Sequence, residues 1–403
     1  MQLPKEVLFI LQTFAQSGFA AYVVGGCVRD ALRQVPPQDW DICTAATPDE
    51  MRQIFAGETL IATGEAHGTM TLIRDKIAYE LTTFRADGPY LDARHPSCVH
   101  FGVSLREDLA RRDFTVNAMA YAPQCGLVDD YGGQADLNAK ILRCVGNPHT
   151  RFAEDALRIL RAARFAATLC FALEAETEQA ALQGANSLTR VAPERVCAEL
   201  AKLLCGENAS AVLLKYMPLF RAIFAENFKE TKFKTAAHAI QDAPQTLCVR
   251  LALLCDAVGT NSLTSLRFDG KTAQTVRTMV QNLHTDFAPT AFAARSALSQ
   301  FGAAALVQIL QAQTALARAE KRAEPAEFTQ IVSEQVAANA PVTLAQLCVN
   351  GTDALALGVK GRAVGTALQA AMQRVLQDEC NNTRDVLLPL LARFATLEKP
   401  REK

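Results

Sequence analysis

The pattern of hydrophobic and polar residues divides the chain into a mixed first part and a longer helical part. The N-terminal stretch "MQLPKEVLFILQTFAQSGFAAYVV" resembles an amphipathic helix. Five short stretches before about residue 135 are rich in Val, Ile, Thr, Tyr and Phe and are bounded by turns. These predicted strands are "AAYVVGG", "DWDICTA", "TMTLIR", "IAYELTTF" and "LVDDYGG". After about residue 150 the strand signals fade, and Ala- and Leu-rich helical periodicity continues to the end. We therefore expect an α+β fold, with a small α/β head followed by an all-helical remainder.

Composition and charge narrow the class of protein. The 403 residues include 41 Lys and Arg and 42 Asp and Glu, so the formal net charge of −1 gives no global signal for a polyanion, and nucleic-acid contacts require local basic clusters. No uncharged run reaches the roughly 18 residues that span a bilayer. The twelve cysteines form no C-x-x-C pair, which favours reduced, buried thiols and argues against zinc. We expect a cytoplasmic protein with no membrane partner.

One helical stretch carries an unusual row of charges. Residues 151–167, "RFAEDALRILRAARFAA", predict a single helix with an apolar core face. Asp155, Arg158, Arg161 and Arg164 follow one another at intervals of three, which places them on one face of such a helix. This face is either a solvated surface with i, i+3 ion pairs or a fixed edge of hydrogen-bonding groups for a ligand.

A glycine pair in the first part is suited to an anion. Residues 23–32, "VVGGCVRDAL", predict a strand, a turn and a helix. Gly25 and Gly26 would let backbone N–H groups approach a phosphate closely, and Arg29 would add a charge-assisted contact. The pattern is not G-x-G-x-x-G, so a dinucleotide fold is not indicated. Taken alone, a Gly-Gly turn has a structural role more often than a binding role.

Two carboxylates follow shortly after this turn. Asp39 and Asp41 flank Trp40 on a predicted strand, where positions i and i+2 face the same side while Trp40 points into the core. Carboxylates this close repel each other unless a cation lies between them, and their hard oxygen atoms suit Mg²⁺. Glu80, on a later strand, is either a third acidic group near the metal or an exposed strand residue.

A second basic cluster lies beyond a loop rich in Gly, Pro and charge. Arg112 and Asp113 begin the segment "RDFTVNAMAY". Arg112 is a candidate for contacting phosphate, and Asp113 for accepting a hydrogen bond from a ribose hydroxyl. The alternative is a salt-bridge cluster at the start of a helix.

The order of these motifs carries a resemblance to a known family. The Gly-Gly-x-x-Arg-Asp turn, Asp-x-Asp, "RRDFTVNAMAY", "DDYGGQADL", "RFAEDALRILRAARFAA" and "ERVCAEL" resemble the class II tRNA nucleotidyltransferases of the DNA polymerase β superfamily over about residues 20–205. That family includes CCA-adding enzymes and bacterial poly(A) polymerases. The resemblance implies a nucleotidyltransferase head with a mixed or antiparallel sheet and an elongated all-α neck, body and tail. The implied ranges are 1–140 (head), 141–205 (neck), 206–295 (body) and 296–403 (tail).

The resemblance also implies ligands. It implies catalytic Mg²⁺ at Asp39 and Asp41, and it implies that neck, body and tail hold the acceptor end of tRNA, with no obligate protein partner evident. CTP and ATP are the implied substrates. The resemblance implies that the glycine turn and the charged residues already described bind the nucleotide. These residues are Gly25, Gly26, Arg29, Arg112, Asp113, Asp155, Arg158, Arg161 and Arg164.

The implied reaction is template-independent addition of C, C and A to tRNA, by attack of the RNA 3′-hydroxyl on the α-phosphate with release of pyrophosphate. Asp155 would accept a hydrogen bond from the amine of cytosine or adenine, and Arg158 would donate one to the ring nitrogen. Uracil and guanine present the reverse arrangement, so this pair would disfavour them. Alternatives are a poly(A) polymerase, a partial CC- or A-adding enzyme, and a non-catalytic RNA-binding protein. The stretch "GEAHGTMTLI" and the loop "DGPYLDARHP" favour full CCA addition, and the retained Asp39, Asp41 and Arg29 oppose a non-catalytic scaffold.

Overall fold

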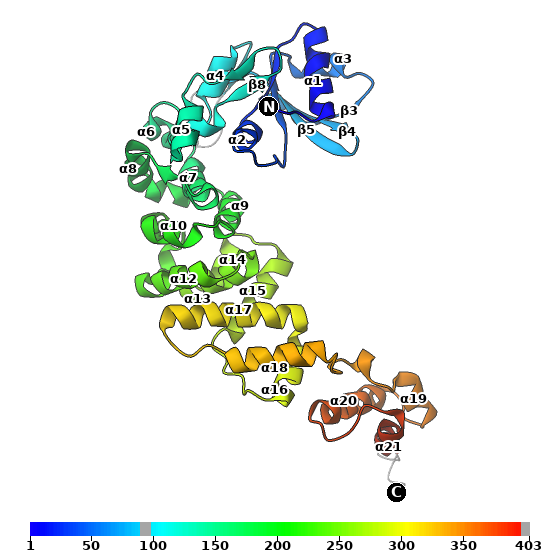
Figure 1. Cartoon of the computed structure of the whole chain (residues 1–403). Helices are drawn as coiled ribbons and strands as arrows, with labels where there is room; N and C mark the ends of the chain where they lie inside the picture. The colour runs from blue at the N-terminus through cyan, green and yellow to red at the C-terminus, as the bar shows by residue number, and fades with distance from the viewer. Residues whose placement is uncertain (89–97, 396–403) are drawn as a thin grey trace. The chain divides into compact units, whose positions relative to one another are not determined.

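The computed structural model describes residues 1–88 and 98–395. The chain separates into two compact units (Figure 1), of which the first comprises Met1–Phe228 with Ser265–Arg267 and the second Lys229–Thr264 with Phe268–Lys403. The first unit holds every residue singled out from the sequence. The proposed division into head, neck, body and tail stays a prediction.

A seven-stranded mixed sheet forms the core of the first unit, in the order β3-β4-β5-β2-β1-β8-β9. β2 runs parallel to β5, while the other neighbours in this sheet are antiparallel. Two further pairs, β6 with β7 and β10 with β11, form small separate sheets. The strands are β1 (Ala21–Val24), β2 (Asp41–Thr44), β3 (Thr59–Gly64), β4 (Thr69–Arg74), β5 (Ile77–Thr83), β6 (Arg85–Asp87), β7 (Val99–Phe101), β8 (Ala120–Ala122), β9 (Gly126–Val128), β10 (Ile141–Leu142) and β11 (Ala172–Leu173). The α+β fold is therefore confirmed.

Helices follow the sheet and fill the remainder of the first unit. α1 is amphipathic as predicted, because Val7, Ile10, Leu11 and Phe14 recur at helical spacing and are buried. The α-helices of this part are α1 (Lys5–Gln16), α2 (Gly26–Leu32), α3 (Pro48–Ile54), α4 (Leu105–Ala110), α5 (Gly133–Ala139), α6 (Pro148–Glu154), α7 (Leu157–Leu169), α8 (Ala175–Gln183), α9 (Pro193–Leu204), α10 (Ala209–Lys215) and α11 (Met217–Ile223). Short 3₁₀ turns are η1 (Glu65–His67), η2 (Thr115–Asn117), η3 (Ala185–Arg190) and η4 (Ala225–Asn227).

The second unit contains only helical elements among its described residues. Separate apolar clusters hold together α16–α18 and α19–α21. The elements are α12 (Glu230–Asp242), α13 (Leu247–Val258), α14 (Asn261–Ser265), α15 (Gly270–Asn282), α16 (Ala291–Phe301), α17 (Ala303–Glu320), α18 (Ala326–Ala337), η5 (Leu344–Gln346), α19 (Gly351–Ala356), α20 (Arg362–Leu376) and α21 (Arg384–Ala395).

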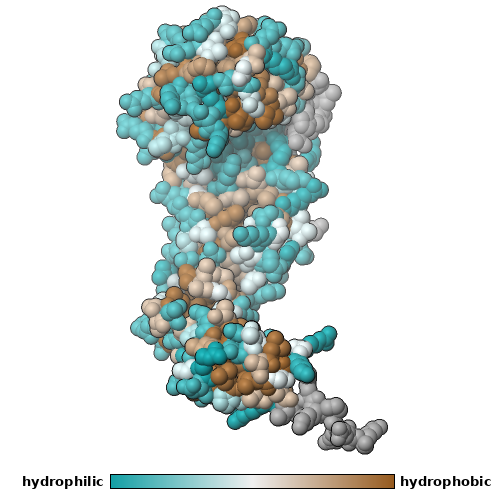
Figure 2. Space-filling view, turned by 90° about the vertical axis from the view of Figure 1, so that its right-hand side faces the viewer, coloured by the Kyte–Doolittle hydropathy of each residue, from teal (hydrophilic) through white to brown (hydrophobic). Residues whose placement is uncertain are grey.

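The surface agrees with the balanced composition. Hydrophilic and hydrophobic side chains are intermixed on the face that Figure 2 shows. Across residues 1–88 and 98–395, none of the helices has the length and apolarity needed to cross a membrane. A cytoplasmic location stays a prediction.

The predicted single helix over residues 151–167 is wrong. The structure has two helices there, α6 and α7, and Asp155 between them is extended, with φ −146° and ψ 104°. The physical reason is local: the Asp155 carboxylate accepts a hydrogen bond from the backbone N–H of Leu157 at 3.1 Å, which is the way aspartate side chains cap a helix start. Asp155 therefore does not share a continuous helical face with the three arginines of α7.

The strand predicted around Trp40 is shorter than expected. β2 begins at Asp41, so Asp39 and Trp40 precede the ladder, and Trp40 is half-buried rather than part of the core. Pro36 and Pro37 lie just upstream and lack the N–H groups that a sheet ladder needs, which is consistent with the late start of pairing.

Three further expectations need correction. The predicted strand "LVDDYGG" ends at Val128, because the Asp129 carboxylate accepts hydrogen bonds from the N–H groups of Gly133 and Gln134 and so helps to start α5. β3 was missed because it is largely exposed and lacks a regular alternation of buried residues. The thiols are not uniformly buried: the structure buries four of the twelve cysteines, Cys27, Cys43, Cys144 and Cys255.

Candidate functional site

A cleft with a volume of about 480 Å³ gathers almost all of the predicted site residues in the first unit. Seven arginines and three aspartates line it, so its electrostatic field favours an anion. Asp39 is the one predicted residue that does not line this cleft. The predicted residues brought together are Gly25, Gly26, Arg29, Asp41, Arg112, Asp113, Asp155, Arg158, Arg161 and Arg164, and they are joined by Arg111, Asn117, Leu157, Phe165 and Arg195.

The glycine turn lies at one side of the cleft, as the sequence predicted. Gly25 has φ +83°, a backbone conformation that favours glycine, and a Cβ atom there would lie 3.1 Å from Arg112 Nη1. Glycine at this position therefore permits both the turn and the close approach of the Arg112 guanidinium. Arg29, in α2, is buried and donates a hydrogen bond from Nη1 to Asn117 Oδ1 at 2.7 Å.

Carboxylates meet at the start of β2. The parallel pairing of β2 with β5 places Asp41 directly opposite Glu80, so the structure brings Glu80 beside the predicted metal site. The surrounding protein removes water from the Asp41 carboxyl group and raises its pKa; Glu80 and Asp39 raise it further, while Arg112 opposes them. Because neighbouring carboxylates repel each other, the pairing of Asp41 with Glu80 favours a cation between or beside them.

The residues present fit a divalent cation only in part. Asp39, Asp41 and Glu80 supply hard oxygen atoms, and within residues 1–88 and 98–395 none of their carboxylates takes part in an ion pair or side-chain hydrogen bond. No group of three or more potential ligand side chains is assembled for a metal in that same part of the chain. Two carboxylates and substrate oxygens together are a common way to hold Mg²⁺-like ions, so the donor set is compatible with that class of metal.

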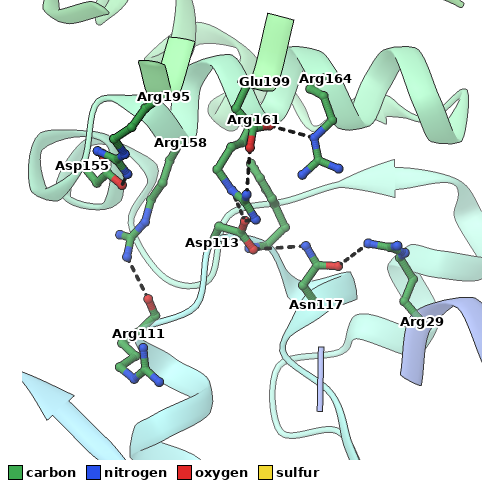
Figure 3. Close-up of polar contacts among 11 residues, drawn as sticks. Arg29, Arg111, Asp113, Asn117, Asp155, Arg158, Arg161, Arg164, Arg195 and Glu199 are labelled. Carbon is green, nitrogen blue, oxygen red and sulfur yellow. Dashed lines mark hydrogen bonds and ion pairs between the residues drawn. The ribbon is translucent and has the colours of Figure 1, made fainter. Parts of the chain in front are cut away.

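Asp113 is a buried hub that connects the two sides of the cleft (Figure 3). Its Oδ2 accepts hydrogen bonds from Arg161 Nε at 2.9 Å and Nη2 at 2.7 Å, and its Oδ1 accepts from Asn117 and from the Phe114 N–H. Burial alone would raise the pKa of Asp113, but Arg161 and these hydrogen bonds lower it to about 2. With four hydrogen bonds already accepted, Asp113 is placed to orient Arg161 rather than to accept from a ribose hydroxyl.

Glu199 continues this network on α9. It is buried and accepts hydrogen bonds from Arg161 Nη1 at 3.1 Å and Arg164 Nε at 2.8 Å. Burial, together with Arg161, lowers the pKa of Arg164, and Glu199 offsets part of that shift. The guanidinium of Arg164 also lies 3.5 Å from the ring centroid of Phe165, so two arginines of α7 are held in fixed orientations.

Asp155 and Arg158 have different partners from those the sequence suggested. Arg195 holds Asp155 in a bidentate ion pair, with Nη1–Oδ1 at 3.1 Å and Nη2–Oδ2 at 2.7 Å. Arg158 pairs with Glu154 and donates from Nη2 to the Arg111 carbonyl oxygen at 2.9 Å (Figure 3). The alternative of a solvated face with i, i+3 ion pairs is wrong, because Asp155 pairs with Arg195 and Arg158 is buried.

Sequence reasoning missed four residues of this network, namely Asn117 as a bridge, Glu154, Arg195 and Glu199. One signal was available: "ERVCAEL" places Arg195 and Glu199 four residues apart among Val, Cys, Ala and Leu, where a buried charged group needs a partner. Nothing in the sequence showed which partners they have. The loop "DGPYLDARHP", used above to favour full CCA addition, lies mostly outside the described residues.

Two parts of the chain match known protein families, and nearly its full length matches curated relatives. Residues 21–143 match the model of the "Poly A polymerase head domain", and residues 170–226 match the "Probable RNA and SrmB-binding site of polymerase A". The CCA-adding enzyme of Lacticaseibacillus paracasei is 35% identical over 394 residues, covering 96% of this chain and 95% of that protein. The CCA-adding enzyme of Geobacillus stearothermophilus is 35% identical over 408 residues, covering 98% of each.

A solved structure extends the likeness to the fold. The crystal structure of the Bacillus stearothermophilus CCA-adding enzyme in complex with CTP matches with a TM-score of 0.80 and 31% identity, over 99% of both chains. Nucleotidyltransferases of this kind depend on a divalent metal. On identity across nearly the full length of two curated relatives, this chain belongs to the CCA-adding enzyme family.

Proposed function

We propose that this protein adds C, C and A to the 3′ end of tRNA without a nucleic-acid template, using CTP and ATP. The observation that carries this proposal is the single cleft in which the Gly25–Gly26 turn, Asp41 and the arginines of α7 meet. Membership of the CCA-adding enzyme family and the likeness to a relative crystallised with CTP support it.

The triphosphate is assigned to the head side of the cleft. The turn at Gly25 and Gly26 lines the cleft, and the guanidinium groups of Arg29 and Arg112 lie next to it. Arg29 and Arg112 are themselves oriented by Asn117 and Asp108, at 2.7 and 3.2 Å. Fixed orientation of these groups lowers the cost of aligning the α-phosphate for attack.

Asp39 and Asp41 would hold Mg²⁺, with Glu80 beside them. When bound, the metal supplies neutralisation of phosphate charge and lowers the pKa of the attacking RNA hydroxyl group. The 3′-hydroxyl group releases its proton to solvent and its oxygen forms a bond to the α-phosphorus. The bond from that phosphorus to the pyrophosphate oxygen breaks, and pyrophosphate leaves with the electron pair. The residues of the chain bind and align the two reactants in this step.

Base selection is assigned to Asp155 and Arg158. Cytosine and adenine each offer an amine donor beside a ring-nitrogen acceptor, whereas uracil and guanine offer a carbonyl acceptor beside an N–H donor. Asp155 Oδ2 accepts one hydrogen bond from Arg195 and so retains capacity to accept from an amine. A mismatched base would leave like groups facing each other, at a cost of about 1–3 kcal/mol for each unsatisfied group.

The RNA is assigned to the helical part of the chain. The match of residues 170–226 to a probable RNA-binding region supports a role for α8 to α11. The further involvement of the second unit rests on the family's implied body and tail and is part of this proposal.

The direct test is addition to tRNA that lacks its 3′ CCA, with purified full-length protein, Mg²⁺ and one nucleotide at a time. Addition of two C residues from CTP and then one A from ATP, with little use of UTP or GTP, is expected. Long A-tails on arbitrary RNA would instead identify a poly(A) polymerase, and addition that stops at CC would identify a partial enzyme.

A further inference from the structure

A second cavity lies in the first unit, between the α6–α7 segment on one side and α8, η3 and the start of α9 on the other. Its volume is about 580 Å³. It shares only Arg195 with the nucleotide cleft, and none of its other lining residues takes part in the contacts described so far. Its size falls within the range of small-ligand sites, which hold roughly 300–1,000 Å³.

The lining combines apolar walls with positive charge. Ala153, Val191 and Ala192 supply accessible hydrophobic surface, while Phe152 and Ile159 are buried in the wall. Arg190 and Arg195 supply positive charge. Among the residues that the structure describes, no aspartate or glutamate lines the cavity. A ligand with one flat apolar part and one anionic part matches this combination, and a nucleotide is such a ligand.

Polar side chains at the cavity are left without partners in the protein. Within residues 1–88 and 98–395, His149, Gln183 and Arg190 form no side-chain hydrogen bond or ion pair, and all three are exposed. The arginines of α7 differ sharply, since Arg158, Arg161 and Arg164 all have carboxylate partners. Groups around the cavity are therefore available to an external ligand without breaking an internal contact.

We propose that this cavity binds one nucleotide of the RNA substrate, with the base against Ala153 and Val191 and the backbone phosphate at Arg190. This inference rests on the proposed function and names a binding site for that substrate. The walls formed by α8 and η3 fall within residues 170–226, the stretch that matches a probable RNA-binding region.

The charge of the cavity favours a phosphodiester over a triphosphate. A free nucleoside triphosphate carries several negative charges, and the cleft offers seven arginines and a glycine turn for it. The cavity offers two arginines and a histidine, and its glycine, Gly184, has φ −80°, an ordinary helical value. One phosphate with a single charge is the better match for this smaller set of donors.

Arg195 couples the two sites. Arg195 lines both of them, and its guanidinium holds the Asp155 carboxylate through two hydrogen bonds. A nucleotide in the cavity would therefore lie against the group that orients the base-selecting carboxylate. Filling the cavity should weaken the binding of RNA, whereas the affinity of the cleft for CTP should change little.

Filling the cavity tests the proposal with the full-length protein. Gln183→Trp introduces a large side chain at an exposed lining position at the end of α8, and Gln179→Trp makes the same change one turn earlier, at an exposed position that does not line the cavity. We expect Gln183→Trp to weaken the binding of CCA-less tRNA, without nucleotide present, by roughly tenfold or more, and to leave the KM for CTP unchanged. The Gln179→Trp control should bind like the wild type.

Removing the positive charge of Arg190 is a second, independent test of the proposal. Arg190→Ala should weaken tRNA binding and reduce the dependence of log Kd on log salt concentration by about one, as expected for one lost phosphate contact. Lys202→Ala, an exposed cation on α9 outside the cavity, should leave both values unchanged. This arm keeps the test decisive even if the tryptophan variant folds poorly.

Two outcomes would overturn the inference, and a third would overturn the proposed function alone. Wild-type tRNA affinity in both cavity variants would show that the cavity does not take RNA. Two CTP sites in the wild type, reduced to one by Gln183→Trp in calorimetry, would show that a free nucleotide occupies it instead. If the wild type itself fails to add C, C and A while the variants still lose RNA affinity, the proposed function fails and the cavity assignment stands.

Discussion

The two sides of the cleft differ in whether their carboxylates are paired with cations. On the sheet side, Asp41 lies opposite Glu80 and near Asp39, and within residues 1–88 and 98–395 none of these carboxylates has an ion-pair partner. On the helical side, Asp155 pairs with Arg195, and Arg164 pairs with Glu199.

Under the proposed function, this difference separates the residues assigned to metal binding from those assigned to base selection. Uncompensated carboxylates are costly to the folded protein but are ready for a cation, whereas paired side chains are held in one orientation and can discriminate between bases. Substitutions on the sheet side should therefore remove activity without loss of stability. Substitutions on the helical side should change stability, selection or both.

The largest effect is expected for Asp41→Ala. Loss of a proposed metal carboxylate should reduce C addition by about 1,000-fold or more, because metal assistance contributes several kcal/mol to the reaction. The affinity for tRNA and the free energy of unfolding should stay near the wild-type values. Single-turnover addition, filter binding and denaturant titration measure these three quantities, with Asp49→Ala, an exposed aspartate on α3, as control. Substantial activity in Asp41→Ala would remove the metal assignment.

Glu199→Ala should have the largest effect on stability. It would leave Arg161 and Arg164 without a shared carboxylate in a largely buried network, at a cost of roughly 3 kcal/mol in the free energy of unfolding. Urea denaturation measures this change, and Glu176→Ala, an exposed glutamate on α8, should be close to neutral. Equal stability of the two variants would contradict the role given to the ion-pair network.

Asp113 should make stability depend on acid pH. Its folded pKa of about 2 lies below the ordinary value of 3.8, so its contribution is fully present above about pH 4 and is lost as the pH falls toward 2. The wild type should exceed Asp113→Asn in the free energy of unfolding by roughly 2 kcal/mol at neutral pH from this source. That difference should narrow between pH 4 and pH 2 in denaturant titrations, and a constant difference would count against the Arg161 contact.

A smaller, more selective effect is expected for Arg195→Lys. Lysine keeps the charge but cannot reproduce the bidentate contact with Asp155, so the preference for CTP over UTP should fall by about fivefold, or roughly 1 kcal/mol. The readout is the ratio of kcat/KM for the two nucleotides, which a merely structural role would leave unchanged. Arg52→Lys provides the matched control, because Arg52 forms an exposed ion pair with Asp49 on α3.

Local motifs explain why much of the cleft could be predicted from the sequence. Two patterns are short-range: the glycine turn is followed by Arg29 one helical turn later, and the arginines of α7 recur at intervals of three. Such spacing determines which residues lie on the same face of a helix. The family resemblance then indicated that these separate patterns meet.

Long-range pairing explains what could not be predicted. Asp155 is 40 residues from Arg195, and Asp113 is 48 residues from Arg161, so no periodicity could indicate those contacts. The break at Asp155 was also hidden, because neither glycine nor proline marks it and the capping contact depends on one side chain. Trp40 was misplaced because alternation along a strand holds only where the strand is paired.

The most direct test of this account is base discrimination by Asp155→Ala. With tRNA that lacks its 3′ CCA, the kcat/KM ratio of CTP to UTP should be at least about 100 for the wild type and should fall by about tenfold or more in the variant, since the amine-accepting group is gone. An unchanged ratio in Asp155→Ala, in a folded variant that still adds nucleotides, would contradict the claim that these side chains take the place of a template.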